Sequence, residues 1–196
     1  MKTLTIGKPN YIELVTNEIM LLNQKYIDES TDNYNFWEQH VKYVVKEAIS
    51  LAKEYGADLE IVELGALLHD VALMANVGER KDHHVNGANI AKDILNKVNY
   101  PKERIESVVG CVLNHRSSKN TKNIEEQCVA DADILAHFDN IPMLFNSAFN
   151  RNNIKLQEIK KWLKDCFEKD YNDLSEMTKK KFKERYEMIC SILIVD

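Results

Sequence analysis

Apolar residues recur every three or four positions along most of the chain, which is the spacing of one face of an α-helix. The alternation of apolar and polar residues that marks a strand is almost absent, and the chain has no internal repeat. These patterns predict an all-α fold. The expected helices cover residues 11–22, 36–52, 59–73, 83–95, 101–112, 124–138, 154–167 and 177–194.

The stretch from Leu59 to Leu73 is apolar nearly all round, which predicts a central buried helix. His69 and Asp70 lie side by side within it, and burial of two polar side chains is costly unless something satisfies both. Adjacent helical residues point about 100° apart, so both can reach one ion lying between their directions. A neutral His69 bonded to Asp70 or to a backbone carbonyl satisfies the pair equally well, so both interpretations stay open.

Glycine and proline, six and three in number, are rare, and their positions predict where helices begin and end. Gly56 suits the residue after the second helix, Pro101 suits a first helical turn, and Pro142 opens or kinks a further helix. The polar segment 146–153 is the best candidate boundary. We therefore expect a helical core at residues 1–150 and a two-helix extension at 151–196 that packs on the same domain.

Composition narrows the class of protein. Of 196 residues, 44% are apolar, which suffices for one ordinary core. The net charge of −5 argues against binding of a nucleic-acid polymer, and the basic run 179–185 is interpreted as the solvated face of the last helix. The four cysteines form no C-x-x-C pair, so reduced core residues are expected. The chain has neither a signal-peptide pattern nor an apolar run of roughly 20 residues, so we expect a cytoplasmic protein without membrane contact.

Histidines and aspartates follow one another in the order H…HD…H…H…D on successive predicted helices, and this series resembles the HD superfamily of metal-dependent phosphohydrolases. The resemblance covers residues 36–145, over half of the chain, and implies an HD-domain helical bundle with a C-terminal helical extension. The motifs are EQHVKYVV with His40, ALLHDVAL with His69 and Asp70, HHVNGANIA with His83 or His84, VVGCVLNHRS with His115, and VADADILAHF with Asp131 or Asp133.

The resemblance implies four metal ligands, which are His40, His69, Asp70 and Asp133. The family pattern of Ala-Asp followed by one residue and then an apolar one favours Asp133 over Asp131. Asp131 lies about 200° away around the same helix and is expected to point to another partner. Nitrogen and carboxylate ligands together suit a divalent metal such as Mn, Fe, Co, Ni or Zn, with Mg also compatible.

The resemblance gives the remaining histidines less definite roles. His83 lies one turn before Gly87 and is favoured over His84 as the third histidine of the series. In some members this position and that of His115 bind a second metal or the phosphate, so His83, His84 and His115 are candidate substrate-binding residues. The family has no fixed histidine at the position of His137, which is interpreted as an ordinary core or surface residue.

The resemblance implies a phosphomonoesterase or phosphodiesterase that cleaves a small-molecule or nucleotide phosphoester with metal-activated water. Asp70 is expected to bind the metal and also to orient and deprotonate the water. Four cations near the histidines are expected to meet the phosphate charge, with solvated loop residues as the competing interpretation. They are Arg116, Lys119, Arg80 and Lys81. Residues 71–73 are apolar where many members carry a Lys or Glu helper, which leaves the general acid or base open.

One metal ion is narrowly favoured over two, because no carboxylate follows the HD pair to help bridge a second ion. Two other functions fit the same series. A di-iron oxygenase of this fold would need both His83 and His115 as ligands, whereas a metal-stabilised binding or sensor module would need no substrate chemistry. A homodimer is compatible with the sequence, and the identity of the substrate is not specified by it.

Overall fold

The computed structural model describes residues 9–31 and 34–193, and within these ranges every regular element is a helix, which confirms the all-α prediction. The first elements are α1 (Tyr11–Glu29), the π-helical turn η1 (Trp37–Val41), α2 (Lys42–Tyr55), α3 (Leu59–Leu68), α4 (Val71–Met74), the short turn η2 (Arg80–Asp82) and α5 (His83–Lys97). The later elements are α6 (Lys102–Asn114), η3 (Ser118–Asn120), α7 (Ile124–Asp139), α8 (Ile141–Asn146), the π-helical turn η4 (Ser147–Arg151), η5 (Leu156–Glu158), α9 (Ile159–Asp173) and α10 (Glu176–Leu193).

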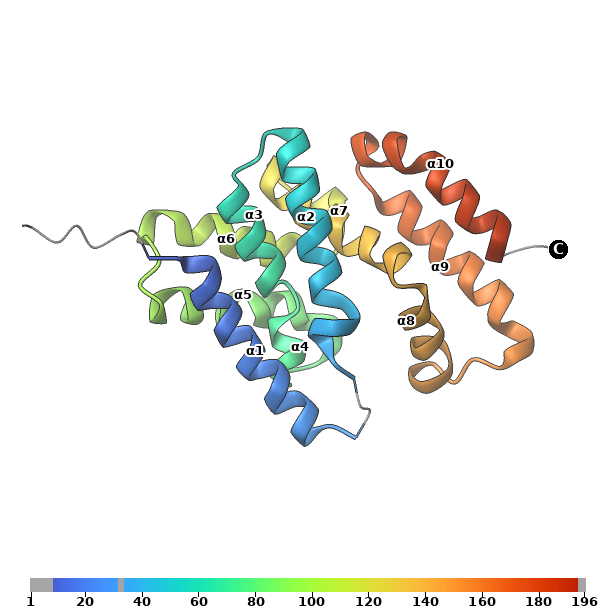
Figure 1. Ribbon diagram of the computed structural model, residues 1–196, viewed down its shortest axis with the longest axis horizontal. Coiled ribbons are helices and arrows are strands. Elements are labelled where there is room, and N and C mark those ends of the chain that lie inside the picture. Colours follow the sequence, from blue (N-terminus) through green and yellow to red (C-terminus); the bar gives the residue numbers. More distant parts are fainter. Residues whose placement is uncertain (1–8, 32–33, 194–196) are drawn as a thin grey trace, which may run out of the picture.

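Helix α7 lies at the centre of the packing, with α2, α3 and α6 against it, while α5 packs on α6 and α4. In Figure 1, helices α1–α7 gather into one bundle and α8–α10 lie beside it, next to the end of α7. Buried apolar side chains form one cluster that runs from Ile19 on α1 to Phe167 on α9 and Phe182 on α10. The C-terminal helices therefore share the core of the bundle. Within the described residues, no helix combines the length and apolar character needed to cross a membrane.

The buried helix expected over residues 59–73 is wrong in one respect, because it breaks at His69 and Asp70. Helix α3 ends at Leu68, and α4 restarts where the amides of Leu73 and Met74 donate to the carbonyl of Asp70. Both helices are largely buried, so the apolar pattern continues across the break and does not indicate where the helix ends. The break places the two polar side chains at a helix junction facing the site described below.

Local signals in the sequence explain several helix ends. Gly56 follows α2 with a φ of 72°, the left-handed conformation that glycine adopts without strain, as predicted. Pro142 lies in the first turn of α8, also as predicted, whereas Pro101 immediately precedes α6 rather than lying in its first turn. The start of the second expected helix is the π-helical turn η1, a distortion that is frequent at functional sites and here carries His40.

The expected boundary at residues 146–153 is largely helical, because η4 continues directly from α8. Helix α9 begins at Ile159, five residues later than expected, after the short turn η5. Two acidic residues of α7 hold the extension in place. Asp131 accepts hydrogen bonds from the Ser175 amide at 2.9 Å and the Thr178 hydroxyl at 2.6 Å, and Asp139 pairs with Arg185.

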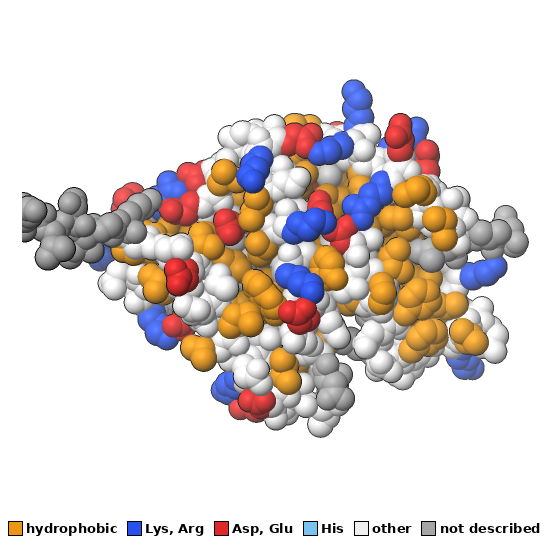
Figure 2. All heavy atoms as spheres, in the orientation of Figure 1, with side chains coloured by type: hydrophobic (Ala, Val, Ile, Leu, Met, Phe, Trp, Pro, Cys, Tyr) orange, Lys and Arg blue, Asp and Glu red, His pale blue; other side chains and the backbone are white. Residues whose placement is uncertain are grey.

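The basic run at 179–185 lies on α10, and its lysines are largely exposed, as expected of a solvated face. Two residues of this run also form ion pairs with the bundle. Lys181 pairs with Glu54 of α2, and Arg185 pairs with Asp139 of α7. Figure 2 shows acidic and basic side chains interspersed over the face in view. Part of this basic run therefore helps to attach the extension to the bundle.

Candidate metal centre

Six side chains from five parts of the chain meet beside α7. They come from the turn η1, the junction of α3 and α4, the first residue of α5, the residue after α6, and the middle of α7. Most are buried, with His69 and His115 almost fully so. The six residues are His40, His69, Asp70, His83, His115 and Asp133.

The first cluster consists of His40, His69 and Asp133. The Nε2 atom of His40 lies 2.9 Å from Oδ1 of Asp133 and 3.1 Å from Nε2 of His69. His69 Nε2 lies 3.8 Å from the same carboxylate oxygen. Two ring nitrogens and one carboxylate oxygen therefore face one small volume, which suits a single divalent ion.

The second cluster consists of Asp70, His83 and His115. The Nε2 atoms of His83 and His115 are 3.0 Å apart, and Oδ1 of Asp70 lies 3.3 Å from the former and 3.8 Å from the latter. The donor types are the same as in the first cluster. This arrangement brings His115 and the favoured His83 into the site.

Asp70 connects the two clusters. Its Oδ2 atom lies 3.7 Å from Nε2 of His40 and 3.6 Å from Nε2 of His69, whereas its Oδ1 atom faces the second cluster. The two oxygens of one carboxylate are thus divided between the clusters. Each ion held there would have an oxygen of Asp70 within reach.

Three of the histidines are held in one tautomer by the backbone. The Nδ1 atoms of His69, His83 and His115 each lie 2.7 Å from a carbonyl oxygen. A carbonyl only accepts, so Nδ1 carries a proton, and each ring in its neutral form points an Nε2 lone pair into the site. The carbonyl oxygens belong to Ala66, Arg80 and Val112 respectively.

The short contact between His83 and His115 indicates whether these residues fit a metal ion. With both Nδ1 atoms already donating, the two Nε2 lone pairs face each other at 3.0 Å and repel unless a cation lies at them. Burial, followed by the nearby His69, lowers the pKa of His115 to about 4, which disfavours a proton as that cation. A divalent ion satisfies both lone pairs, so the donor set fits a metal.

Both carboxylates are held in the ionised form that a ligand requires. Burial alone would raise the pKa of Asp70, but the neighbouring His69 and His40 outweigh it and lower the pKa. For Asp133 burial is again the largest opposing effect, and the hydrogen bond and charge of His40 hold the pKa well below its usual value. The side chain of Asp131 points away to Ser175 and Thr178, as the helix spacing predicted.

His137 is part of the site, contrary to its interpretation as an ordinary histidine. Its ring stacks on that of His40 with centroids 5.7 Å apart, and its Nδ1 atom lies 2.8 Å from Oδ2 of Asp170 on α9. Burial by itself would lower the pKa of His137, but Asp170 raises it to about 9. The sequence signal was its position one turn after Asp133, whereas its partner is 33 residues away.

A cavity of about 360 Å³ opens onto these residues. Arg116 and Arg80 line it, as expected, and so does Lys169, a cation that the sequence did not single out as a phosphate ligand. Three of the expected substrate ligands, Lys81, Lys119 and His84, lie outside the lining. Lys119 is exposed and pairs with Asp173 at 3.7 Å, and the neighbour of His83, His84, has a buried Nδ1 atom without a hydrogen-bond partner.

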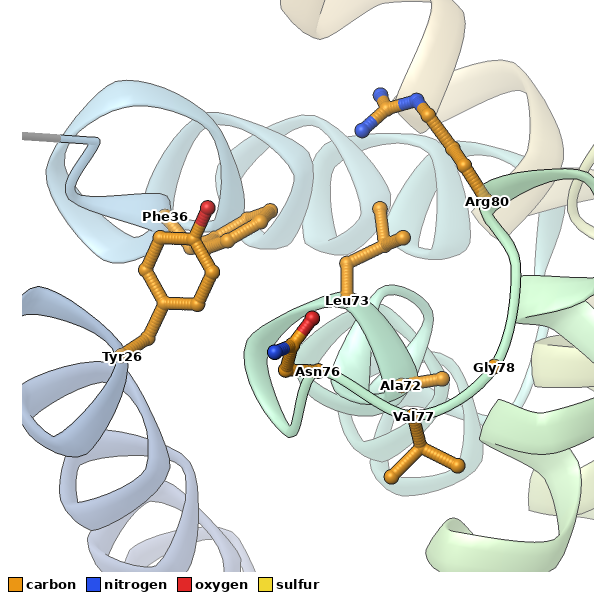
Figure 3. Close-up of a pocket in the computed structure, with 8 residues that line it drawn as sticks. All are labelled: Tyr26, Phe36, Ala72, Leu73, Asn76, Val77, Gly78 and Arg80. Carbon is orange, nitrogen blue, oxygen red and sulfur yellow. The ribbon is translucent and has the colours of Figure 1, made fainter. Parts of the chain in front are cut away.

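A second hollow of about 280 Å³ adjoins the cavity and shares Phe36 and Arg80 with it. Figure 3 shows Tyr26 and Phe36 on one side and the short helix α4 on the other, with Arg80 reaching over the hollow. Arg80 thus lies between the two spaces. The metal-facing cavity is the larger of the two and holds the candidate ligands.

A sequence profile described as the HD domain matches residues 37–137. A predicted HD superfamily hydrolase from an uncultured Thermotogales bacterium has a similar structure, with a TM-score of 0.63 and 18% identity over 90% of this chain and 87% of that one. An HD-superfamily hydrolase from Bacillus thuringiensis gives a TM-score of 0.61 and 21% identity over 89% and 90%.

A curated relative from Clostridium beijerinckii, an uncharacterized protein, is 29% identical over 76 residues. The aligned part is 39% of this chain and 48% of that protein, so the chain matches about half the length of this relative. The family profile covers more than half of the chain and ends at residue 137, before α8, α9 and α10 begin. It includes all six residues of the two clusters. The chain therefore belongs to the HD domain family.

Proposed function

We propose that this protein is a metal-dependent phosphohydrolase that holds two divalent ions and cleaves a small-molecule or nucleotide phosphoester. The observation that carries the proposal is the position of Asp70, which directs one carboxylate oxygen toward each three-residue cluster. Two-metal hydrolases hold their ions about 3.5–4 Å apart, and a shared carboxylate suits that spacing.

The number of ions proposed here differs from the sequence expectation. One ion was favoured because no second carboxylate follows His69 and Asp70. In the structure Asp70 offers both of its oxygens, so the second cluster needs no further carboxylate. This supports His83 and His115 as metal ligands rather than as imidazoles that bind the phosphate.

The residues around the clusters suit hydrolysis of an anionic ester. When bound, the ions would supply a water with a pKa near 7 instead of about 15.7. Asp70 is kept ionised by its neighbours, and we expect it to orient that water by accepting a hydrogen bond from it. Arg80, Arg116 and Lys169 line the cavity and would donate hydrogen bonds to phosphate oxygens. His137 adds a positive charge beside the first cluster.

Metal analysis followed by a phosphate-release screen tests the proposal. The purified protein, supplied in turn with Mn²⁺, Co²⁺, Ni²⁺ and Mg²⁺, should release phosphate from a phosphoester panel of nucleotides, cyclic nucleotides and small phosphomonoesters. Asp70→Ala should lose both metal and phosphate release, because it removes an oxygen from each cluster. Metal-loaded protein that releases no phosphate from any ester would contradict the proposal and favour a binding or sensor module.

A di-iron oxygenase is the second candidate, because His83 and His115 both face the second cluster as that chemistry requires. The two candidates differ in what they consume. An oxygenase loaded with iron would take up oxygen in the presence of its substrate, whereas the hydrolase would not. The cations Arg80, Arg116 and Lys169 around the cavity favour the phosphoester.

A further inference from the structure

One face of helix α9 lines the cavity that the candidate metal ligands also line. The lining positions recur at intervals of three or four residues, the spacing of a single helical face. The neighbouring Leu163 and Phe167 are buried and anchor the helix to the core. The lining residues of α9 are Trp162, Cys166, Lys169, Asp170 and Asp173.

This wall is fixed relative to the metal ligands. The rings of Phe167 on α9 and Phe138 on α7 stack with centroids 5.0 Å apart. His137 bonds to Asp170 at 2.8 Å, and Ser117 donates to Asp173 at 2.7 Å. The two acidic residues of the wall therefore already have partners in the protein, which leaves Trp162, Cys166 and Lys169 to meet a ligand.

Among the Phe, Tyr and Trp side chains that line the cavity, Trp162 is the most accessible to a ligand. It is half-buried, whereas Phe36 and Tyr34 are almost fully buried and pack edge to face on each other with centroids 4.8 Å apart. The half-buried Met143 lies in the same lining. A flat indole that is open to a cavity is a surface on which another flat ring can stack, and a thioether in the same lining is an apolar, polarisable neighbour for such a ring.

We propose that α9 determines substrate specificity, and that Trp162 stacks on the base of a nucleoside phosphate whose phosphate lies at the two clusters. The inference rests on the proposed phosphohydrolase function and names its substrate class. Helix α9 lies outside the residues that the HD profile matches, so this wall is additional to the part of the chain that carries the six candidate ligands. Base–aromatic stacking contributes about 1–3 kcal/mol per base, which corresponds to roughly five- to 150-fold in affinity.

A fluorescence titration tests stacking by a readout that does not depend on turnover. The chain has two tryptophans, Trp37 and Trp162, so two variants separate their signals. With Mg²⁺ present, nucleoside monophosphates should change the emission of the wild type and of Trp37→Phe but not of Trp162→Phe. Glycerol 3-phosphate, which has no ring, should leave the emission of all three unchanged. A nucleotide-dependent change that persists in Trp162→Phe, or none in the wild type, would overturn the inference.

Kinetics give a second readout of the same proposal. Trp162→Ala should lower the ratio of kcat/KM for nucleoside monophosphates to kcat/KM for glycerol 3-phosphate about fivefold or more. Trp37→Phe, which changes the tryptophan outside the cavity lining, is the matched control and should keep the ratio. An equal loss for both esters in Trp162→Ala would overturn the stacking role. If neither ester is cleaved with any metal, the phosphohydrolase proposal fails, and the fluorescence titration alone decides the assignment of Trp162.

Discussion

His137 on α7 donates a hydrogen bond from Nδ1 to Oδ2 of Asp170 on α9, across 2.8 Å. This contact links the helix that carries Asp133 to the C-terminal extension, and His137 also stacks on His40. This charged pair therefore joins the extension to the candidate metal centre. Its consequences for stability and for the site can be measured separately.

Asp170→Asn should lower the pKa of His137 from about 9, because Asp170 is what raises it against the effect of burial. The folded-state pKa lies above the ordinary 6.5, so the pair stabilises the fold fully below about pH 6.5, and this stabilisation is lost as the pH rises through about 9. We expect Asp170→Asn to cost about 2 kcal/mol of unfolding free energy at pH 6 and much less at pH 10.

Histidine NMR titration and denaturant unfolding at both pH values provide the measurements. The control is Asp165→Asn, which removes an exposed carboxylate from the same helix. An unchanged pKa of His137 in Asp170→Asn would show that the pair does not set its charge. The same loss of stability at pH 6 and pH 10 would show that the contact acts by packing alone.

Substitutions of Asp131 and Asp133 should affect the stability of the fold and the binding of metal separately. Residues two apart on a helix point to nearly opposite sides. Asp133→Asn should release the ion of the first cluster, because Asp133 lies 2.9 Å from His40 in that cluster. Asp131→Asn should retain the metal but lower the unfolding free energy by about 1–3 kcal/mol, because it weakens the bonds to Ser175 and Thr178. Elemental analysis and thermal unfolding of both variants decide this, and equal metal loss would contradict the geometry.

His83 and His84 provide a matched pair of adjacent histidines. His83→Ala should reduce the metal content by one ion, because the Nε2 atom of His83 faces His115 and Asp70. His84→Ala should keep the metal, because His84 belongs to neither cluster. Metal content by elemental analysis is the readout. Loss of metal in His84→Ala but not in His83→Ala would reverse the assignment.

Removal of metal should destabilise the fold, since the ligands come from five separate parts of the chain. An ion present at about 100 times its dissociation constant contributes about 2.7 kcal/mol to the free energy of unfolding. Chelation should therefore lower the melting temperature, and added divalent metal should restore it. An unchanged melting temperature in protein shown to be metal-free would argue that the clusters are already stable without ions.

Much of the fold could be predicted because helical periodicity is a local property of the chain. The helix at 124–138 and the different directions of Asp131 and Asp133 follow from spacing alone. The order of the histidines and aspartates likewise placed the candidate ligands on successive helices. The break between α3 and α4 could not be predicted, because both helices are buried and their apolar pattern is continuous.

The contribution of the C-terminal extension to the cavity could not be predicted either. Trp162 and Asp170 reach the cavity only because α9 folds back along α7, and a contact between distant residues has no local signature. His137 therefore had no visible partner in the sequence. The sharing of Asp70 between two clusters depends in the same way on tertiary geometry.

The central claim, that Asp70 is shared between two metal ions, is tested most directly by the metal stoichiometry of the wild type and of His115→Ala. His115 belongs to the second cluster only, so its loss should leave the first cluster complete. The account predicts two ions per chain in the wild type and one in His115→Ala. One ion in both proteins would show that His115 is not a ligand and would contradict the two-metal centre, and zero in His115→Ala would contradict the division into two clusters.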